Sequence, residues 1–261
     1  MMRCFIFLLL VTLITENVDA QSRVTIIGSV HSPTKCITQD TLLSALYQFK
    51  TDDILLELDT SLMDEKGNFK KSPEKISLEA ATAQHFKERN KNINLAQIDV
   101  VYRNQYYKNN NTFAKENQLG KLVDSIYKNN LFNDTSWFII NSLYNATQIL
   151  NNMGYMRLKD INSDICMKIA SIRQNLLYKR QVDLIYNNRI LKGSYPFAKE
   201  AAEFWNLRNQ TMISNILNYI KGHPNRNIAV LVGYYHKYAL LDGLKPLASS
   251  NHFILVDDLI R

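Results

Sequence analysis

Two histidines in this sequence stand in the same local pattern, and both are of a type that acid/base and metal chemistry use. Residues 24–27 are β-branched, and a Gly-x-x-His segment that ends at His31 follows them. Residues 230–232 and a second Gly-x-x-His segment, which ends at His236, repeat the arrangement. Because glycine permits a tight turn and ligands bind beyond the carboxyl ends of parallel strands, the pair predicts one site that holds a metal ion or acts as a base. For either histidine alone, the alternative is a loop residue bonded to the backbone.

A carboxylate is expected beside these histidines. Glu57 interrupts the apolar run 54–58, so it lies in or at the end of a buried strand, and Asp59 follows on the same face. A solvated strand end is the structural alternative, but a buried carboxylate is costly unless it is paired or metal-bound. We therefore interpret Glu57 as a metal ligand or a general acid/base. Together His31, Glu57 and His236 suit a divalent ion such as Zn, Mn or Co.

Arg208 and Asn209 form a third candidate feature. Both border an apolar stripe at helical spacing that includes Trp205 and Met212. In the structural interpretation, Arg208 anchors Glu57 or Asp59. In the functional one, Arg208 orients an acidic ligand or stabilises an oxyanion, and Arg208 and Asn209 join Glu57 as catalytic candidates.

Two adjacent tyrosines lie inside the second Gly-x-x-His segment. Most of the 14 tyrosines are interpreted as packing residues. Tyr234 and Tyr235, by their position, are candidates to line a pocket or to ligate iron, including haem iron.

Strand-type and helical segments alternate along the chain, which predicts parallel βαβ units. Helices are predicted at 38–49, with Thr38 as N-cap, at 72–91, starting at Ser72-Pro73, and at 197–221. Residues 115–195 have helical periodicity without a clear strand and predict a helical insertion packed over the sheet. The fold class is therefore α/β, with a mostly parallel sheet flanked by helices, in a single domain over 21–261. The predicted strands are 24–27, 54–58, 93–100, 228–232 and 253–256.

The composition is that of a globular protein, with 46% apolar and 21% charged residues, and excludes wholesale disorder. The formal net charge is +7, but the lysines are scattered and no nucleic-acid motif is present, so no nucleic-acid partner is expected.

The first twenty residues predict a signal peptide. Arg3 precedes an apolar run at 5–14 that is too short to span a bilayer, and Val18-Asp19-Ala20 suits cleavage before Gln21. We expect an exported protein, periplasmic or extracellular, without a stable membrane anchor; an uncleaved anchor is the alternative.

As a set, these motifs resemble a distant member of the TraB/Tiki superfamily, which includes GumN-like proteins, ChaN-like haem-uptake proteins and erythromycin esterases. The resemblance implies an α/β core with a helical insertion, a metal-dependent peptidase site at His31, His236 and Glu57, and further acidic positions at Glu79 and Asp99. Two tyrosines stand where the family has small residues between Gly and His. The resemblance rests on four motifs in the family's order: Gly28-Ser29-Val30-His31, Glu57-Leu58-Asp59, Arg208-Asn209-Gln210-Thr211-Met212 and Gly233-Tyr234-Tyr235-His236.

The leading functional prediction is a metal-dependent hydrolase, peptidase-like, acting on a peptide or a small molecule. The metal would lower the pKa of a bound water and polarise the carbonyl group. The alternatives are a ChaN-type protein that binds haem or iron, with Tyr234 or Tyr235 as an axial ligand, and a degenerate scaffold without catalysis.

Overall fold

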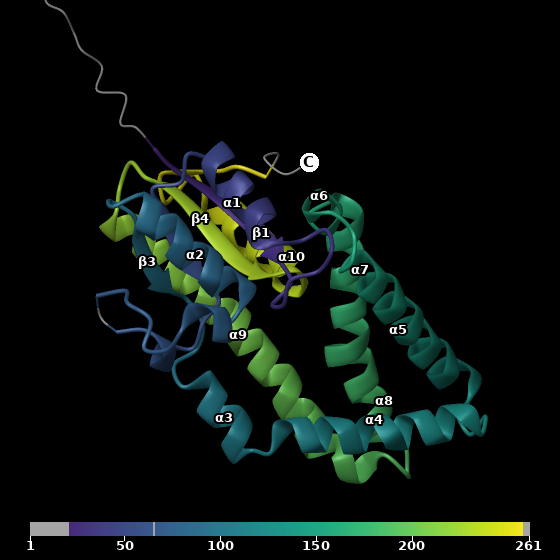
Figure 1. Ribbon diagram of the computed structural model, residues 1–261. Helices are drawn as coiled ribbons and strands as arrows, with labels where there is room; N and C mark the ends of the chain where they lie inside the picture. Colours follow the sequence, from purple (N-terminus) through teal and green to yellow (C-terminus); the bar gives the residue numbers. More distant parts are fainter. Residues whose placement is uncertain (1–20, 65, 258–261) are drawn as a thin grey trace, which may run out of the picture.

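The protein is described here by a computed structural model that covers residues 21–64 and 66–257 (Figure 1). The predicted signal peptide at 1–20 lies outside the described residues. Within the described part, no helix combines the length and the apolar character needed to cross a membrane.

Five strands form one sheet in the order β3-β2-β4-β1-β5, and every pairing is parallel. The last long strand in sequence, β4, lies between the first two, so β1 and β2 are not neighbours. The predicted α/β class with a parallel sheet is thereby confirmed. The strands are β1 (Ser22–Ser29), β2 (Asp53–Leu56), β3 (Asn94–Gln97), β4 (Asn227–Gly233) and β5 (Phe253–Leu255).

Helices cover both faces of the sheet, which explains why the central strands are apolar on both sides. On one face, α1 (Gln39–Gln48) and α2 (Leu78–Arg89) pack on a cluster that contains Ile27. On the other face, α10 (Tyr234–Leu244) and the second half of α9 (Tyr195–Gly222) pack on a cluster that contains Ile26. Successive residues of β1 thus enter different cores.

The helices between β3 and α9 form an insertion with a core of its own. Part of the insertion packs over the sheet, since Leu158, Ile161 and Cys166 belong to the cluster that contains Ile27, whereas the helix Thr112–Lys128 (α4) lies at the far end of the molecule from the sheet (Figure 1). The core of the insertion contains Val123, Ile140 and Leu184. The helices are α3 (Arg103–Asn109), α4 (Thr112–Lys128), α5 (Asp134–Met153), α6 (Leu158–Ile161), α7 (Asp164–Asn175) and α8 (Gln181–Asn187), with a π-helical segment at Leu176–Arg180.

Several predicted boundaries are corrected by local hydrogen bonds. Thr38 caps α1 as expected, but the helix predicted from Ser72 begins at Leu78, after a short 3-10 helix at Pro73–Lys75. The Ser77 hydroxyl accepts from the Ala80 N–H and is the true cap. Strand β2 ends at Leu56 and β3 at Gln97, so both are shorter than predicted.

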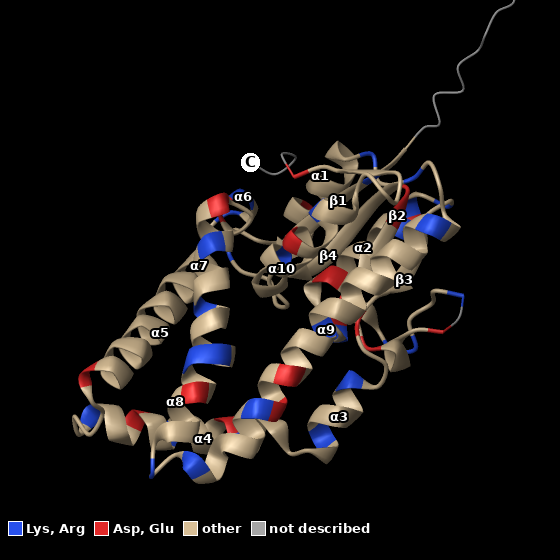
Figure 2. Cartoon of the chain, turned by 180° about the vertical axis from the view of Figure 1, so that it is seen from behind, with Lys and Arg blue, Asp and Glu red and all other residues tan. Residues whose placement is uncertain are grey.

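Basic and acidic side chains are interspersed along the helices of the insertion (Figure 2). This distribution matches the scattered lysines of the sequence. Of the charged groups that are buried, Glu57, Asp99 and Arg208 lie at the carboxyl edge of the sheet, where the candidate site is found, and Asp53 pairs with Arg226 at the amino edge.

Candidate functional site

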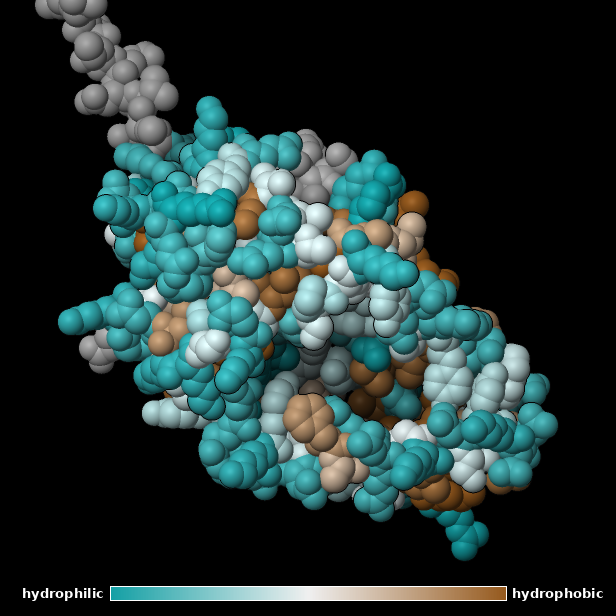
Figure 3. All heavy atoms as spheres, in the orientation of Figure 1, coloured by the Kyte–Doolittle hydropathy of each residue, from teal (hydrophilic) through white to brown (hydrophobic). Residues whose placement is uncertain are grey.

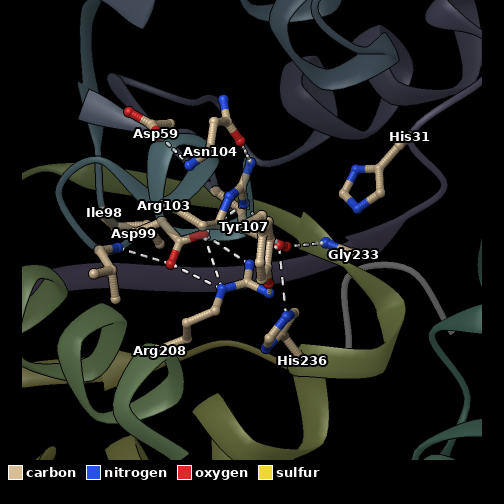
Figure 4. A network of polar contacts seen from close by, with 12 residues as sticks. His31, Asp59, Ile98, Asp99, Arg103, Asn104, Tyr107, Arg208, Gly233 and His236 are labelled. Atoms are coloured by element: carbon tan, nitrogen blue, oxygen red, sulfur yellow. Dashed lines mark hydrogen bonds and ion pairs between the residues drawn. The ribbon is translucent and has the colours of Figure 1, made fainter. Parts of the chain in front are cut away.

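Glu57 stands at the centre of the site, one residue beyond the end of β2. Its backbone N–H donates to the carbonyl of Leu231 on β4 at 3.1 Å, which extends the pairing of the two strands to this point. Its side chain is buried, and Oε2 accepts the Gly233 N–H at 2.7 Å while Oε1 accepts from Arg208 Nη2 at 2.6 Å (Figure 4). Hydrogen bonds of both the backbone and the side chain of Glu57 therefore hold its carboxylate at the ends of β2 and β4.

Two guanidinium groups and a second carboxylate complete a buried ionic network. Asp99, which is fully buried beyond β3, accepts from Arg208 Nη2 at 2.7 Å and from Arg103 Nη1 at 2.6 Å. Arg103 Nη1 also lies 3.6 Å from Glu57 Oε1. Two positive and two negative charges thus balance within one cluster, which is the condition for burying them.

The network determines the ionisation of its members. Burial alone would raise the pKa of Glu57, but positive charge from His236 in its protonated form and from Arg208 lowers it well below its ordinary range. Burial opposes the charge of Arg208, yet Glu57 and Asp99 raise its pKa. Glu57 is therefore ionised at any physiological pH.

His236 is buried in the first turn of α10, behind Glu57. The amide nitrogen of Asn209 donates to the Trp205 carbonyl at 2.9 Å, so the amide oxygen accepts from His236 Nδ1 at 2.7 Å. This assigns the tautomer and leaves Nε2, which is 3.5 Å from Glu57 Oε1, without a proton in the neutral ring. Burial lowers the pKa of His236 to about 4, and the ring stacks on Trp205 at 4.1 Å between centroids.

His31 differs from His236 in exposure and in charge. Its side chain is 61% exposed, and Nδ1 lies 3.4 Å from Oε1 of Glu79, a buried residue in the first turn of α2. Glu79 raises the pKa of His31 to about 9, against the lowering effect of burial. The backbone positions this pair, because the Leu78 N–H donates to the His31 carbonyl at 3.0 Å.

Gly233 is required where the two Gly-x-x-His segments meet. A Cβ at this position would lie 3.1 Å from His31 Nε2 and 3.4 Å from Glu57 Oε2. The glycine therefore lets the exposed histidine approach the central carboxylate.

An open cleft of about 290 Å³ gives access to the site. His31, Glu57 and Arg103 line it together with Lys71 and Lys75, which belong to the segment that leads into α2. A second cavity of about 90 Å³, lined mainly by aromatic side chains, lies on the other side of Arg208, toward the insertion. Figure 3 shows the surface hollowed between the sheet half and the insertion.

The structure brings together His31, Glu57, Arg208 and His236, and Asn209 joins them through His236. Asp59 is not part of the group. Its two oxygens accept the backbone N–H groups of Ser61 and Asn104, so it organises the chain beyond β2. Of the two anchors that the structural interpretation offered for Arg208, Glu57 is the one it pairs with; its second partner is Asp99 in place of Asp59.

The two tyrosines of the second motif point elsewhere. The Tyr234 hydroxyl donates to the Leu150 carbonyl on α5 at 3.0 Å, and the guanidinium of Arg173 on α7 lies 5.2 Å from the centre of the Tyr235 ring. Both side chains thus pack toward the insertion. Their role as pocket residues or haem ligands stays a prediction.

Sequence reasoning missed Arg103 and the stacking role of Trp205. Arg103 stands four residues after Asp99, the spacing of an ion pair on a helix, which was the available signal. Nothing local marks the contact from Asp99 to Arg208, because the two residues are 109 positions apart.

The predicted metal ligands fit a metal ion poorly as they are placed. In the part of the chain that the structure describes, no three side chains from His, Cys, Asp and Glu are grouped around one metal position. Both Glu57 oxygens already accept short hydrogen bonds, from Arg208 and Gly233. Metal binding by His31, Glu57 and His236 stays a prediction.

Comparison with known proteins gives one structural likeness. No family model and no curated protein matches the chain. A solved structure of a mutant of the erythromycin esterase EreC, in its open conformation, is 14% identical with a TM-score of 0.32 over 81% of this chain. The match covers 60% of that longer chain. Erythromycin esterases are among the proteins that the sequence motifs resemble. Membership of the TraB/Tiki superfamily stays a prediction.

Proposed function

We propose that the chain is a hydrolase that cleaves an ester or amide bond with water, and that His31 is its general base. The observation that carries the proposal is the pair of exposed His31 and buried Glu79, 3.4 Å apart, at an open cleft. A carboxylate on one ring nitrogen fixes the tautomer and orientation of an imidazole, so the other nitrogen is left to take a proton. Here that nitrogen is Nε2, which lies beside Gly233 and the central carboxylate.

The other described residues of the cleft are less suited to this role. Glu57 is held ionised and both its oxygens accept hydrogen bonds, so it is a weak base. Arg103 and the lysines already carry protons, and the Ser77 hydroxyl caps α2. His31 in its neutral form, which predominates above a pKa of about 9, is therefore the group that removes a proton from water in the proposed reaction.

Arg103 is the proposed stabiliser of the developing oxyanion. Its Nη1 lies 2.6 Å from Asp99 and 3.6 Å from Glu57, and the residue lines the cleft. A fixed cationic donor of this kind lowers the barrier wherever negative charge develops on a carbonyl oxygen. Arg208, to which the sequence assigned this role, is buried and holds Glu57 in place.

A metal-dependent hydrolase is the second candidate. It is favoured by the unprotonated Nε2 of His236 beside Glu57, which is the kind of nitrogen that binds a divalent ion. His31 and Glu57 would then complete the ligands, and the metal would supply an activated water. Arg208 and Gly233 already donate hydrogen bonds to the two Glu57 oxygens, and a metal ion would have to compete with these donors.

The pH dependence of kcat/KM tests the general base. Only a neutral imidazole accepts a proton, so activity on a chromogenic ester is expected to rise about tenfold per pH unit and to level off above about 9. Glu79→Gln removes the charge that stabilises the imidazolium, so the pKa of His31 falls and the rise moves to lower pH. His31→Ala should lower kcat/KM about 100-fold or more.

His85→Ala, on the same helix as Glu79 and outside the cleft, is the matched control and should leave the profile unchanged. Full activity of His31→Ala would end the proposal. Loss of activity on chelation, restored by Zn, Mn or Co, would support the metal-dependent candidate instead.

A further inference from the structure

The cleft over the site carries an excess of positive charge. Lys71 and Lys75 line it on one segment, and His31 and Arg103 of the proposed site line it as well. Among the described residues, neither lysine ammonium has a hydrogen-bond or ion-pair partner. Of the cations at the cleft, Arg103 pairs with Asp99 at 2.6 Å and His31 lies 3.4 Å from Glu79, so the excess charge is that of the two lysines.

The segment that carries the two lysines is fixed beside the site. The Lys70 N–H donates to the Leu62 carbonyl at 2.9 Å, and the Lys75 N–H donates to the Ser72 carbonyl at 3.1 Å. The 3-10 helix at Pro73–Lys75 leads into α2, which holds Glu79. The lysines are thus connected by a short stretch of chain to the partner of the proposed base.

Arg103 has one side-chain donor without a hydrogen-bond partner among the described residues. Its Nη1 serves Asp99, but its Nε is buried without a hydrogen-bond partner. A buried donor that is left unpaired costs free energy, so an acceptor that reached this nitrogen would be stabilised by it. A cleft lined by charges of one sign also concentrates ligands of the opposite sign.

We propose that the cleft recognises a substrate with a carboxylate or phosphate group near the bond that is cleaved, and that Lys71 and Lys75 hold this anionic group. The proposal rests on the proposed hydrolase function and adds the class of substrate. Lysines act here as point charges, so they select the charge of the group more than its shape. With the anionic group held by the two lysines, the adjacent carbonyl would lie against His31 and Arg103, which line the same cleft.

Two esters with the same 4-nitrophenol leaving group test the proposal. One has a neutral acyl chain, and in the other the chain ends in a carboxylate. In the double variant Lys71→Gln/Lys75→Gln, KM for the anionic ester is expected to rise about tenfold, because two exposed ion pairs are lost, while kcat stays within about twofold. KM for the neutral ester should not change.

Lys70→Gln is the matched control, since Lys70 is exposed on the same segment but does not line the cleft. It should leave KM for both esters at the wild-type value. An equal rise of KM for the neutral and the anionic ester, or an equal effect of Lys70→Gln, would overturn the proposal.

A binding experiment separates this proposal from the hydrolase function. Glutarate and inorganic phosphate are titrated into the wild type and the double variant by calorimetry, at low and moderate salt. Salt-sensitive binding that the double variant weakens about tenfold supports the proposal even if no ester is cleaved. Whichever of the two probes binds more tightly identifies the group, and absence of binding by both would overturn the proposal. A chain that binds anions but hydrolyses nothing would refute the hydrolase function alone.

Discussion

The two halves of the molecule bury different kinds of side chain. At the carboxyl edge of the sheet, Glu57, Asp99 and Arg208 are all buried in one ionic network. The core of the insertion contains apolar residues such as Ile140 and Leu184, and the ion pair Lys199–Glu203 near the start of α9 is 56% and 66% exposed. Desolvated charges are expensive, and an apolar core stabilises a helical bundle without them. The difference indicates that the sheet edge carries the chemistry, while the insertion is held by ordinary packing.

Helix α9 joins the two halves and passes through both environments. Ala198 near its start belongs to the core of the insertion, and Met212 and Ile216 belong to a core of the sheet. Arg208 lies between these groups, at the level of the site. A single helix thus couples the position of the insertion to the ionic network.

Loss of the Arg208 guanidinium is expected to have the largest effect. Arg208→Met leaves Glu57 and Asp99 with Arg103 alone, so the free energy of unfolding should fall by about 3–5 kcal/mol and activity should be lost. Arg208→Lys keeps the charge but lacks the paired donors of the guanidinium, so its free energy of unfolding should lie between those of the wild type and Arg208→Met. Urea unfolding measures all three proteins.

The comparison for that experiment is Lys199→Ala, which breaks the exposed pair on the same helix. Its cost should be less than about 1 kcal/mol. Equal losses for Arg208→Met and Lys199→Ala would contradict the contrast between the two halves.

Two glycine substitutions should have opposite results. Gly233→Ala places a Cβ 3.1 Å from His31 Nε2, so His31 must move and kcat/KM should fall about tenfold or more. Gly120→Ala, in α4, meets no atom within 4 Å and should raise the free energy of unfolding by about 0.5–1 kcal/mol, because alanine is the better helix former. Kinetics and thermal unfolding of both variants check this, and a fully active Gly233→Ala would show that His31 need not approach so closely.

The smallest effect is expected at Trp205, where α9 stacks on the site. The Trp205 ring lies between Tyr178, at 5.2 Å, and His236, at 4.1 Å. Trp205→Ala admits water, so the pKa of His236 should rise from about 4 toward 6.5, whereas Trp205→Phe should keep it low.

An NMR titration of the imidazole measures that shift, and unfolding measurements give its consequence. Between pH 4 and 6.5, His236 binds a proton in the unfolded chain but not in the native protein. The wild type therefore loses stability as the pH falls through this window. The free energy of unfolding of Trp205→Ala should fall less over the same range. An unchanged pH dependence would mean that Trp205 does not shield the His236 ring from water.

Much of the sheet was predictable because its strands are encoded locally. The β-branched run at 24–27 and the apolar run at 228–232 identify β1 and β4, and glycines follow both. Boundaries were less certain. Ser72 and Ser77 are equally good caps by type, and the hydrogen bond from Leu78 to His31, which favours the second, joins segments far apart in the sequence.

The site was predictable in its members but not in its pairings. Repeated Gly-x-x-His segments and a carboxylate in an apolar strand identified His31, His236 and Glu57 from local sequence. The opposite exposure of the two histidines depends on Trp205 and Glu79, which come from different helices. Such contacts follow from the packing of the whole chain, and one sequence contains no local signal for them.

The position of β4 has a consequence for how the molecule folds. Leu56 pairs with Leu231, and Gly28 pairs with Val232, so the central strand is supplied after the whole insertion has been passed. Closing a loop of this length is slow compared with the formation of the local helices of the insertion. The hydrogen bond between Gly233 and Glu57 can form only after that closure, so the insertion is expected to be structured early in folding and the ionic network to assemble late.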